Sequence, residues 1–380
     1  MSMLQPQLML VSLALLSGAT VAPGETESSV PRIIVPLPPA VAVEYATGAK
    51  KILPMQEVWR PNCSNPEAIT VSDLARIARS HRELASSGNV LVIDTPRTEL
   101  VGLDIVFNVS GSIPAGAPAA IAAAEAYIES QFSDPITVTI DCSFAPMSPG
   151  VIGGTGSAYG YVTYAGTRSG LVAGMDGNDT IQSFLPSGST VPVRYNGNTS
   201  SVTNENRVFW TLANYNAAVA FVAGTAASMQ FNSNFTFDWD PSNGVSGGTI
   251  SFQDVVVHET AHALGFTSGG DFRSKDLEVL DLWRFQTTDG SGDYNPDSTA
   301  EFQVRPRLVS WNKPNDSHHV DMISVEYRMA DGSPWQMSHF REQVPNIGLM
   351  DPAIDFGETH YPNFYATSDL TMIDAIGYDR

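Results

Sequence analysis

The strongest constraint on the fold is a helix signal in residues 251–266, SFQDVVVHETAHALGF. Ser251 is a favourable N-cap, and Asp254 follows three residues later, where an acidic side chain can bond back to the start of a helix. Gly265 stands where helices commonly end, because glycine readily adopts the left-handed conformation of a C-terminal cap. The run of valines in the middle of the segment favours burial. The sequence therefore predicts a buried helix over residues 252–264.

Two histidines on this predicted helix are spaced for metal binding. His258 and His262 are four residues apart, so both imidazoles lie on one face and could hold one metal ion. Glu259 projects beside that face, where it could accept a proton from water without being a ligand. An HExxH pattern arises by chance in about one chain in a hundred, so an ordinary core helix is the alternative. The two caps and the apolar run favour the metal site.

The composition indicates an acidic, exported protein. The formal net charge is −20, from 20 basic and 40 acidic side chains, which argues against nucleic acid as a partner. Charged residues make up only 16% of the chain, so neutral polar side chains supply much of the polarity. An apolar run at residues 8–16, followed by small residues, predicts a signal peptide over residues 1–19 and a secreted protein. No later stretch is long and apolar enough to predict a stable membrane span.

The rest of the chain divides into two predicted parts. Residues 20–98 contain a proline-dense stretch and form an amino-terminal or pro-segment. Residues 99–380 form the predicted catalytic domain, in which alternating apolar residues and an alanine-rich stretch predict a strand, a helix and a strand between residues 101 and 140. Residues 150–174 are rich in glycine and lack the lysine of a phosphate-binding loop, which favours a glycine-rich loop or an edge strand. This succession predicts an α+β fold.

Two histidines leave a catalytic metal ion one protein ligand short, because such a site has three protein ligands and an open position. Several side chains after the predicted helix could supply the third ligand. Glu278 would lie on a second helix predicted over residues 275–285. The candidates are Asp271, Glu278, His318, His319, His339 and His360.

Three short motifs in fixed order resemble the leishmanolysin-like branch of the metzincin zinc endopeptidases. They are HETAHALGF at residues 258–266, Ser-His-Phe at 338–340 and GLMDP at 348–352. In the common metzincin pattern the third histidine falls ten residues after the first, but that position is Ser268 here. In the leishmanolysin-like branch an insertion separates the helix from the third histidine. In this chain the insertion would cover residues from about 271 to 337. His339 lies 77 residues after His262 and 11 residues before Met350.

The resemblance implies a site as well as a fold. It implies His258, His262 and His339 as ligands of one catalytic Zn²⁺, Glu259 as general base, and Met350 in a Met-turn beneath the metal. It also implies a metzincin-like domain with a twisted mixed sheet, an active-site helix and a less regular C-terminal subdomain that carries the insertion. Asp271 remains the second candidate for the third ligand.

The two cysteines allow two hypotheses. In an exported chain the default is one disulfide, which would join Cys63 to Cys142. The alternative starts from residues 61–67, PNCSNPE, which resemble the cysteine switch of matrixin pro-segments, with Asn62 in place of the arginine. A Cys63 thiolate would then occupy the open position of the metal. Leishmanolysins are rich in disulfides, whereas this chain has only two cysteines, so it departs from them in this respect.

A second metal ion is suggested by residues 289–297, DGSGDYNPD, which place oxygen side chains at alternate positions. An EF-hand loop requires glycine at its sixth position, and Tyr294 stands there. The pattern favours a solvated acidic loop and leaves Ca²⁺ as the alternative.

These observations together predict a secreted zinc-dependent endopeptidase that acts on proteins or peptides. Two other classes remain open. One is an extracellular binding or adhesion module that retains a structural zinc, which would need a fourth protein ligand and no general base. The other is a zinc hydrolase that acts on a non-peptide substrate.

Overall fold

The structure is a computed structural model that describes residues 41–44, 50–53, 56–59, 90–94, 101–148, 150–195, 201–272, 275–286, 295–311, 318–332, 335–343 and 345–380. The chain divides into two compact units, Met1–Val30 and Pro31–Arg380. The first unit, with the expected signal peptide, lies outside the described residues. The proline-dense stretch and Cys63 also lie outside them.

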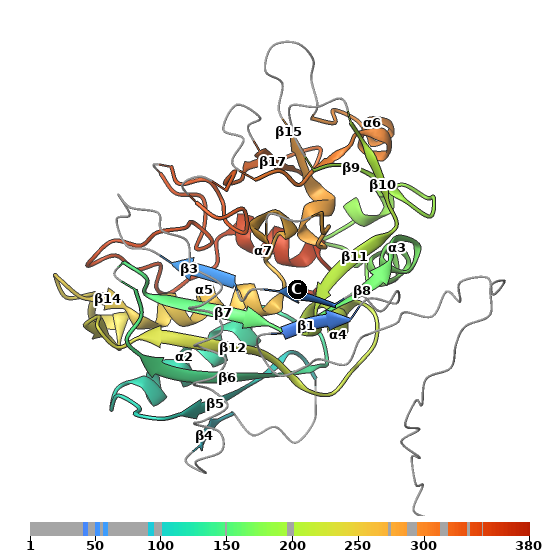
Figure 1. Cartoon of the computed structure of the whole chain (residues 1–380). Coiled ribbons are helices and arrows are strands. Elements are labelled where there is room, and N and C mark those ends of the chain that lie inside the picture. The colour runs from blue at the N-terminus through green and yellow to red at the C-terminus, as the bar shows by residue number, and fades with distance from the viewer. Residues whose placement is uncertain are drawn as a thin grey trace, which may run out of the picture. The chain divides into compact units, whose positions relative to one another are not determined.

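The centre of the second unit is a six-stranded mixed sheet, which twists as Figure 1 shows. The order is β3 (Gln56–Trp59), β7 (Gly153–Ser157), β12 (Thr225–Asn232), β6 (Thr137–Ala145), β5 (Asp104–Ser110) and β4 (Val90–Ile93). The inner pairs β5–β6 and β6–β12 are parallel, whereas β4, β7 and β3 pair antiparallel with their neighbours. The predicted α+β class with a twisted mixed sheet is confirmed. Two of the six strands come from residues before position 99.

Two helices lie along this sheet, α2 (Ala117–Glu129) and α5 (Phe252–Leu264), and they pack against each other. Alternating residues of β5 and β6 are buried, including Phe107 and Ile140, because successive side chains of a strand point to opposite faces. β5, α2 and β6 appear in the order that the sequence predicted. Helix α5 has the bounds predicted from its caps.

The glycine-rich residues 150–174 do not form a loop. They form β7, then β8 (Tyr159–Thr163), and then helix α3 (Tyr164–Ala173). Within the described residues β7 has β12 on one side and β3 on the other, so it is not an edge strand. The expected loop is therefore wrong, whereas β8 pairs only with β11 among the described residues and lies at the edge of a two-stranded sheet, as the edge-strand alternative predicted. The central strand β7 was missed because small residues let a strand lie close against a helix, which removes the usual pattern of apolar side chains.

Smaller sheets and helices complete the unit. The strands are β1 (Val41–Glu44), β2 (Lys50–Leu53), β9 (Val191–Arg194), β10 (Thr203–Glu205), β11 (Arg207–Thr211), β13 (Phe237–Asp238), β14 (Ile250–Ser251), β15 (Arg284–Gln286), β16 (Arg307–Leu308), β17 (His318–Asp321) and β18 (Glu326–Arg328). The pairs and small sheets are β1–β2, β8–β11, β13–β14, β10–β9–β16 and β15–β17–β18. The remaining α-helices are α4 (Leu212–Ala218), α6 (Thr299–Val304) and α7 (Thr367–Ala375). Short 3-10 turns are η1 (Ile181–Phe184), η2 (Pro241–Asn243), η3 (Gly269–Phe272) and η4 (Leu280–Trp283).

The helix predicted over residues 275–285 is absent from the described residues. The turn η4 is followed directly by strand β15. The Asp281 carboxylate accepts hydrogen bonds from the backbone N–H groups of Gly269 and Glu278, at 2.9 and 3.0 Å. It also lies 3.4 Å from the buried guanidinium of Arg284. Because these buried polar contacts fix a tight turn, a continuous helix does not form.

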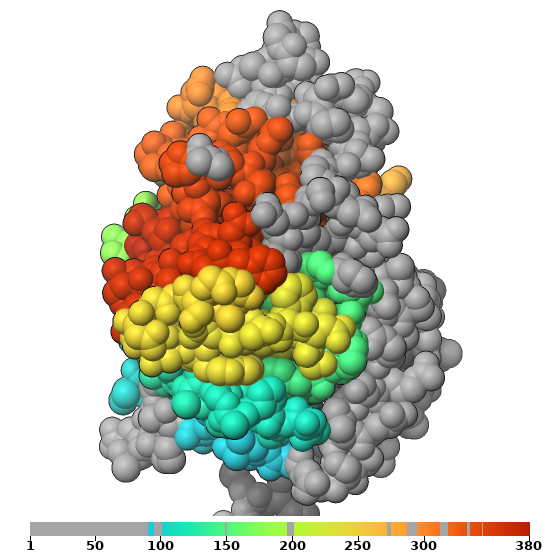
Figure 2. Space-filling model, turned by 90° about the vertical axis from the view of Figure 1, so that its left-hand side faces the viewer, coloured from blue at the N-terminus to red at the C-terminus, as the bar shows by residue number. Residues whose placement is uncertain are grey.

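Between α5 and α7 the regular elements of the described residues are short: η3, η4, β15, α6, β16, β17 and β18. Figure 2 shows the yellow part of the chain, which includes β13 and β14, as a band between sheet residues in cyan and green and C-terminal residues in red. On this face the C-terminal residues therefore lie against the yellow part of the chain. None of the described helices is long and apolar enough to cross a membrane.

Candidate metal centre

Helix α5 supplies the first half of the candidate centre. Its N-cap Ser251 accepts a hydrogen bond from the backbone N–H of Asp254. It ends at Gly265, whose φ of 118° lies in the left-handed region that a side chain would disfavour. All of its residues are buried. The caps thus fix where the helix starts and stops.

Three imidazoles meet at one point inside the protein. The Nε2 atom of His258 lies 3.0 Å from Nε2 of His262 and 3.2 Å from Nε2 of His339. All three side chains are fully buried. Within the described residues they form a group that could hold a metal ion.

The orientation of the imidazoles is fixed by backbone carbonyl groups. Nδ1 of His258 lies 2.9 Å from the Leu349 oxygen, and Nδ1 of His262 lies 2.7 Å from the Phe266 oxygen. A carbonyl only accepts, so each Nδ1 carries the proton and each Nε2 keeps its lone pair for the centre. Burial lowers the pKa of His262 to about 3 and holds the pKa of His258 well below its usual value. Neutral rings with inward lone pairs are the form that binds a metal ion.

Glu259 lies between the two helix histidines and against strand β7. The Thr155 hydroxyl donates to Oε2 of Glu259 at 2.6 Å. Oε1 is buried and has no hydrogen-bond partner among the described residues. A Cβ added at Gly153 would lie only 3.0 Å from Oε1, so glycine leaves room for this carboxylate. Burial raises the pKa of Glu259 to about 8, and the Thr155 hydrogen bond opposes this shift.

His339 is positioned by Asp271, which does not join the histidine group. The Asp271 carboxylate accepts a hydrogen bond from the backbone N–H of Ser338 at 2.9 Å. It also accepts hydrogen bonds from the Ser338 hydroxyl and the Met337 N–H. Asp271 therefore binds the two residues that precede His339 and fixes the direction from which the imidazole enters.

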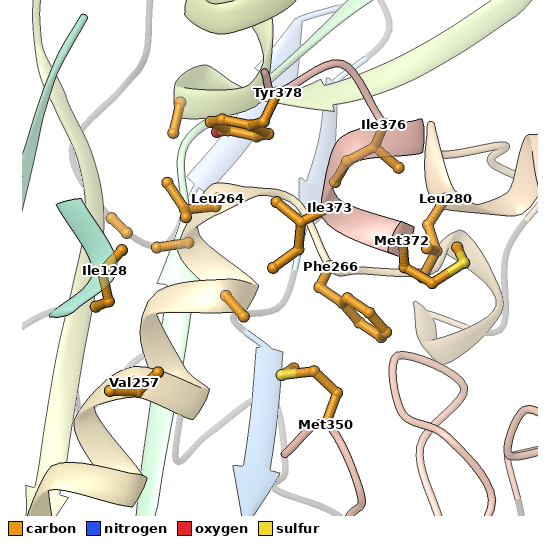
Figure 3. Packing of buried hydrophobic residues seen from close by; sticks show 14 of the residues in the cluster. Ile128, Val257, Leu264, Phe266, Leu280, Met350, Met372, Ile373, Ile376 and Tyr378 are labelled. Carbon is orange, nitrogen blue, oxygen red and sulfur yellow. The ribbon is translucent and has the colours of Figure 1, made fainter. Parts of the chain in front are cut away.

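Met350 is fully buried beside the centre. Its backbone oxygen accepts a hydrogen bond from the Phe340 N–H at 2.9 Å. The Asp369 carboxylate of α7 accepts from the backbone N–H groups of Leu349 and Met350, at 2.8 and 3.0 Å. Figure 3 shows Met350 in the apolar cluster shared by α5 and α7. The turn at Met350 is thus fastened to the histidine segment and to α7, and it presents the Leu349 oxygen to His258.

The other third-ligand candidates have different partners. Glu278 accepts a hydrogen bond from the Thr267 hydroxyl. His318 lies 3.5 Å from the Arg284 guanidinium, and His319 pairs with Glu326. His360 lies 2.9 Å from Asp254 at the other end of α5. The structure therefore brings together His258, His262 and His339 and leaves these four side chains elsewhere.

The remaining predicted features are only partly described. Cys142 lies on β6, is fully buried and forms no disulfide within the described residues. Because Cys63 lies outside them, both the disulfide and the cysteine switch stay predictions. Most of the acidic loop at residues 289–297 is also outside the described residues, so its Ca²⁺ reading stays untested.

The sequence did not predict the roles of three residues that position the site. Thr155 binds Glu259, Asp271 orients His339 without being a ligand, and Asp369 holds the turn at Met350. Thr155 was hidden in a glycine-rich strand. Asp271 and Asp369 act on residues distant in sequence, through backbone groups that leave no side-chain pattern. The available signal was that Asp369 is an acidic residue in the first turn of α7, a position that suits a negative charge.

The comparisons with protein-family models, curated protein sequences and solved structures found no match to the chain.

Proposed function

We propose that this chain is a secreted zinc-dependent endopeptidase of metzincin type. The observation that carries the proposal is the convergence of three buried imidazoles, with Nε2 atoms 3.0 and 3.2 Å apart. Tetrahedral zinc with Zn–N distances of about 2.0–2.1 Å would space neighbouring nitrogens about 3.3 Å apart. The donor set and its spacing fit zinc, and a glutamate stands next to the ligands.

Zinc held by His258, His262 and His339 would supply Lewis-acid polarisation of a peptide carbonyl and would acidify bound water. Glu259 would act as general base and then return the proton to the leaving amine. Its buried Oε1 is the oxygen available for this transfer, while Thr155 holds Oε2. A pKa near neutrality suits a group that must both accept and release a proton.

The buried state of the centre supports a latent form of the full chain. The three histidines and Glu259 are all fully buried, so a polypeptide substrate cannot reach them directly. Strand β3, from the predicted pro-segment, pairs with β7 so that Trp59 is opposite Gly153. Gly153 is the residue that borders Oε1 of Glu259. We therefore expect activity to require displacement or removal of β3.

A structural zinc site is the alternative that predicts a different donor set. It would need a fourth protein ligand, and the group contains three side chains among the described residues. It would also give no role to a buried glutamate with one oxygen unbonded. The geometry therefore favours a catalytic zinc site over a structural one.

The test is hydrolysis of casein or gelatin by purified protein, before and after limited proteolysis in the segment that precedes β4. Activity should be lost with a chelator and restored by zinc. Glu259→Gln should keep its zinc and lose activity about 10²- to 10⁴-fold, because only the proton transfer is removed. Absence of chelator-sensitive cleavage in both preparations would sink the peptidase proposal. Cleavage of non-peptide esters alone would favour the other hydrolase class.

A further inference from the structure

A second group of potential ligands lies away from the histidines, where the loop between α3 and η1 meets the end of α7. Carboxylate oxygens of Asp176, Asp179 and Asp374 lie within 4.8 Å of one another. Two oxygens bound to one Ca²⁺ at about 2.3–2.6 Å can be up to about 5 Å apart. The three carboxylates are therefore close enough to share one ion.

One buried carboxylate oxygen of this group has no donor among the described residues. Asp374 is 1% exposed, and its Oδ1 has no hydrogen-bond partner among the described residues. Gln182 is fully buried, and its amide nitrogen donates a hydrogen bond to the Asp179 carboxylate. The same amide lies 3.5 and 3.4 Å from the backbone oxygens of Asp374 and Ala375. A buried acceptor without a donor is costly, so a further partner is expected at Oδ1 of Asp374.

The charge balance leads to the same conclusion. Burial is the main cause that raises the pKa of Asp374 to about 7 and that of Asp179 to about 6, with smaller contributions from neighbouring carboxylates that include Asp379. The Arg380 guanidinium, 2.8 Å from Asp374, is partly exposed and bonds the other carboxylate oxygen, Oδ2. The single positive charge of Arg380 cannot balance the carboxylates of Asp176, Asp179, Asp374 and Asp379. A water molecule could satisfy hydrogen bonds here but would not offset the charge.

We propose that Asp176, Asp179 and Asp374 form a Ca²⁺ site, in which the three carboxylates are the protein ligands and water molecules complete the coordination. Calcium takes six to eight oxygen ligands in flexible geometry, including carboxylates, amides and carbonyls. All the donors here are oxygens, unlike the nitrogen set of the histidine centre. The negative end of a helix dipole at α7 also favours a cation.

Such a site would fasten α7 to the α3–η1 connection. The opposite end of α7 carries Asp369, which holds the turn at Met350. The ion would therefore stabilise the helix on which the Met350 turn depends. This role does not require the chain to be a peptidase.

The experiment uses the full chain, freed of calcium on a chelating resin and replenished with zinc. Titration with CaCl₂ should show one ion per chain by calorimetry and should raise the melting temperature by about 3 °C or more. Asp179→Asn and Asp374→Asn should each weaken Ca²⁺ binding at least tenfold. The matched control is Asp293→Asn, in the acidic loop at residues 289–297, which should bind Ca²⁺ as the wild type does.

Two results would overturn the proposal. One is the absence of saturable binding up to about 10 mM Ca²⁺, which is beyond the weak end of extracellular calcium modules. The other is loss of binding in Asp293→Asn with binding retained in Asp179→Asn. If an Asn variant fails to fold, Asp176→Asn provides the same test, because Asp176 is only half-buried. Peptidase activity is not part of the readout, so this proposal and the proposed function can fail independently.

Discussion

The two halves of the metal centre are built in different ways. His258 and His262 come from one helical turn, and their orientation is completed by Phe266, four residues further on, and by Leu349. His339 comes from a segment without helical structure, held by carboxylates that lie far away in the sequence. The first half thus depends mainly on local helix formation. The second depends on tertiary contacts, so we expect it to be the more easily disrupted half.

Loss of Asp369 should have the largest effect on stability. Asp369→Ala would leave the buried backbone N–H groups of Leu349 and Met350 and the partly buried N–H of Ala366 without their acceptor. We expect the free energy of unfolding to fall by about 3 kcal/mol or more and zinc affinity to fall about 10- to 100-fold. Urea unfolding and competition with a zinc indicator measure both quantities.

The matched control is Asp355→Ala, an exposed acidic residue near the same turn. It should behave as the wild type. If Asp369→Ala also kept wild-type stability and zinc affinity, the Met350 turn would not depend on α7. The contrast between the two halves would then be wrong.

An intermediate effect is expected from the pH dependence of the same turn. Asp351 is 2% exposed, and neither carboxylate oxygen has a hydrogen-bond partner among the described residues. Burial, with help from Glu342 and other carboxylates, raises its pKa from 3.8 to about 8. Between these values the folded chain holds a proton that the unfolded chain has released. The contribution of this group to stability is therefore present at low pH and is lost as pH rises toward 8.

Asp351→Asn removes this titration and should flatten the stability curve. At pH 8 we expect the variant to be more stable than the wild type, by about 2 kcal/mol. At pH 4 the two proteins should differ little. The measurement is the free energy of unfolding of both proteins at both pH values. If stability changed with pH as much in the variant as in the wild type, another group would be responsible for the titration.

The smallest effect is expected in the locally built half. Ser251→Ala removes the N-cap of α5 and should cost about 1 kcal/mol of stability. Ser251→Thr retains the hydroxyl and serves as the control. Both variants should keep stoichiometric zinc in metal analysis, because the helix is held by its buried sides. Loss of zinc from Ser251→Ala would show that the helix half is as fragile as the other.

The same contrast explains what the sequence could predict. Helix α5 was predictable to its ends because its caps, apolar run and histidines all lie within residues 251–266. The mixed sheet was predictable in part, from the alternating residues of β5 and β6. The helix expected over residues 275–285 was not formed, because buried contacts between Asp281, Arg284 and distant backbone groups select a turn. Helix propensity and the spacing of residues in the sequence do not reveal such contacts.

Asp271 illustrates the same limit within the site. Its residue type and position made it a reasonable candidate ligand. Its carboxylate instead accepts hydrogen bonds from Met337 and Ser338, and it thereby orients His339. Whether a carboxylate binds a metal ion or a backbone segment is decided by the folded chain, which spacing alone does not reveal.

Zinc content of variants at a saturating zinc concentration is the most direct test of the central claim, that His258, His262 and His339 hold one metal ion. The wild type should contain one zinc per chain after desalting. His339→Ala should lose it, whereas Asp271→Asn should retain it with weaker affinity, because Asp271 acts only through His339. Stoichiometric zinc in His339→Ala together with its loss in Asp271→Asn would contradict the account.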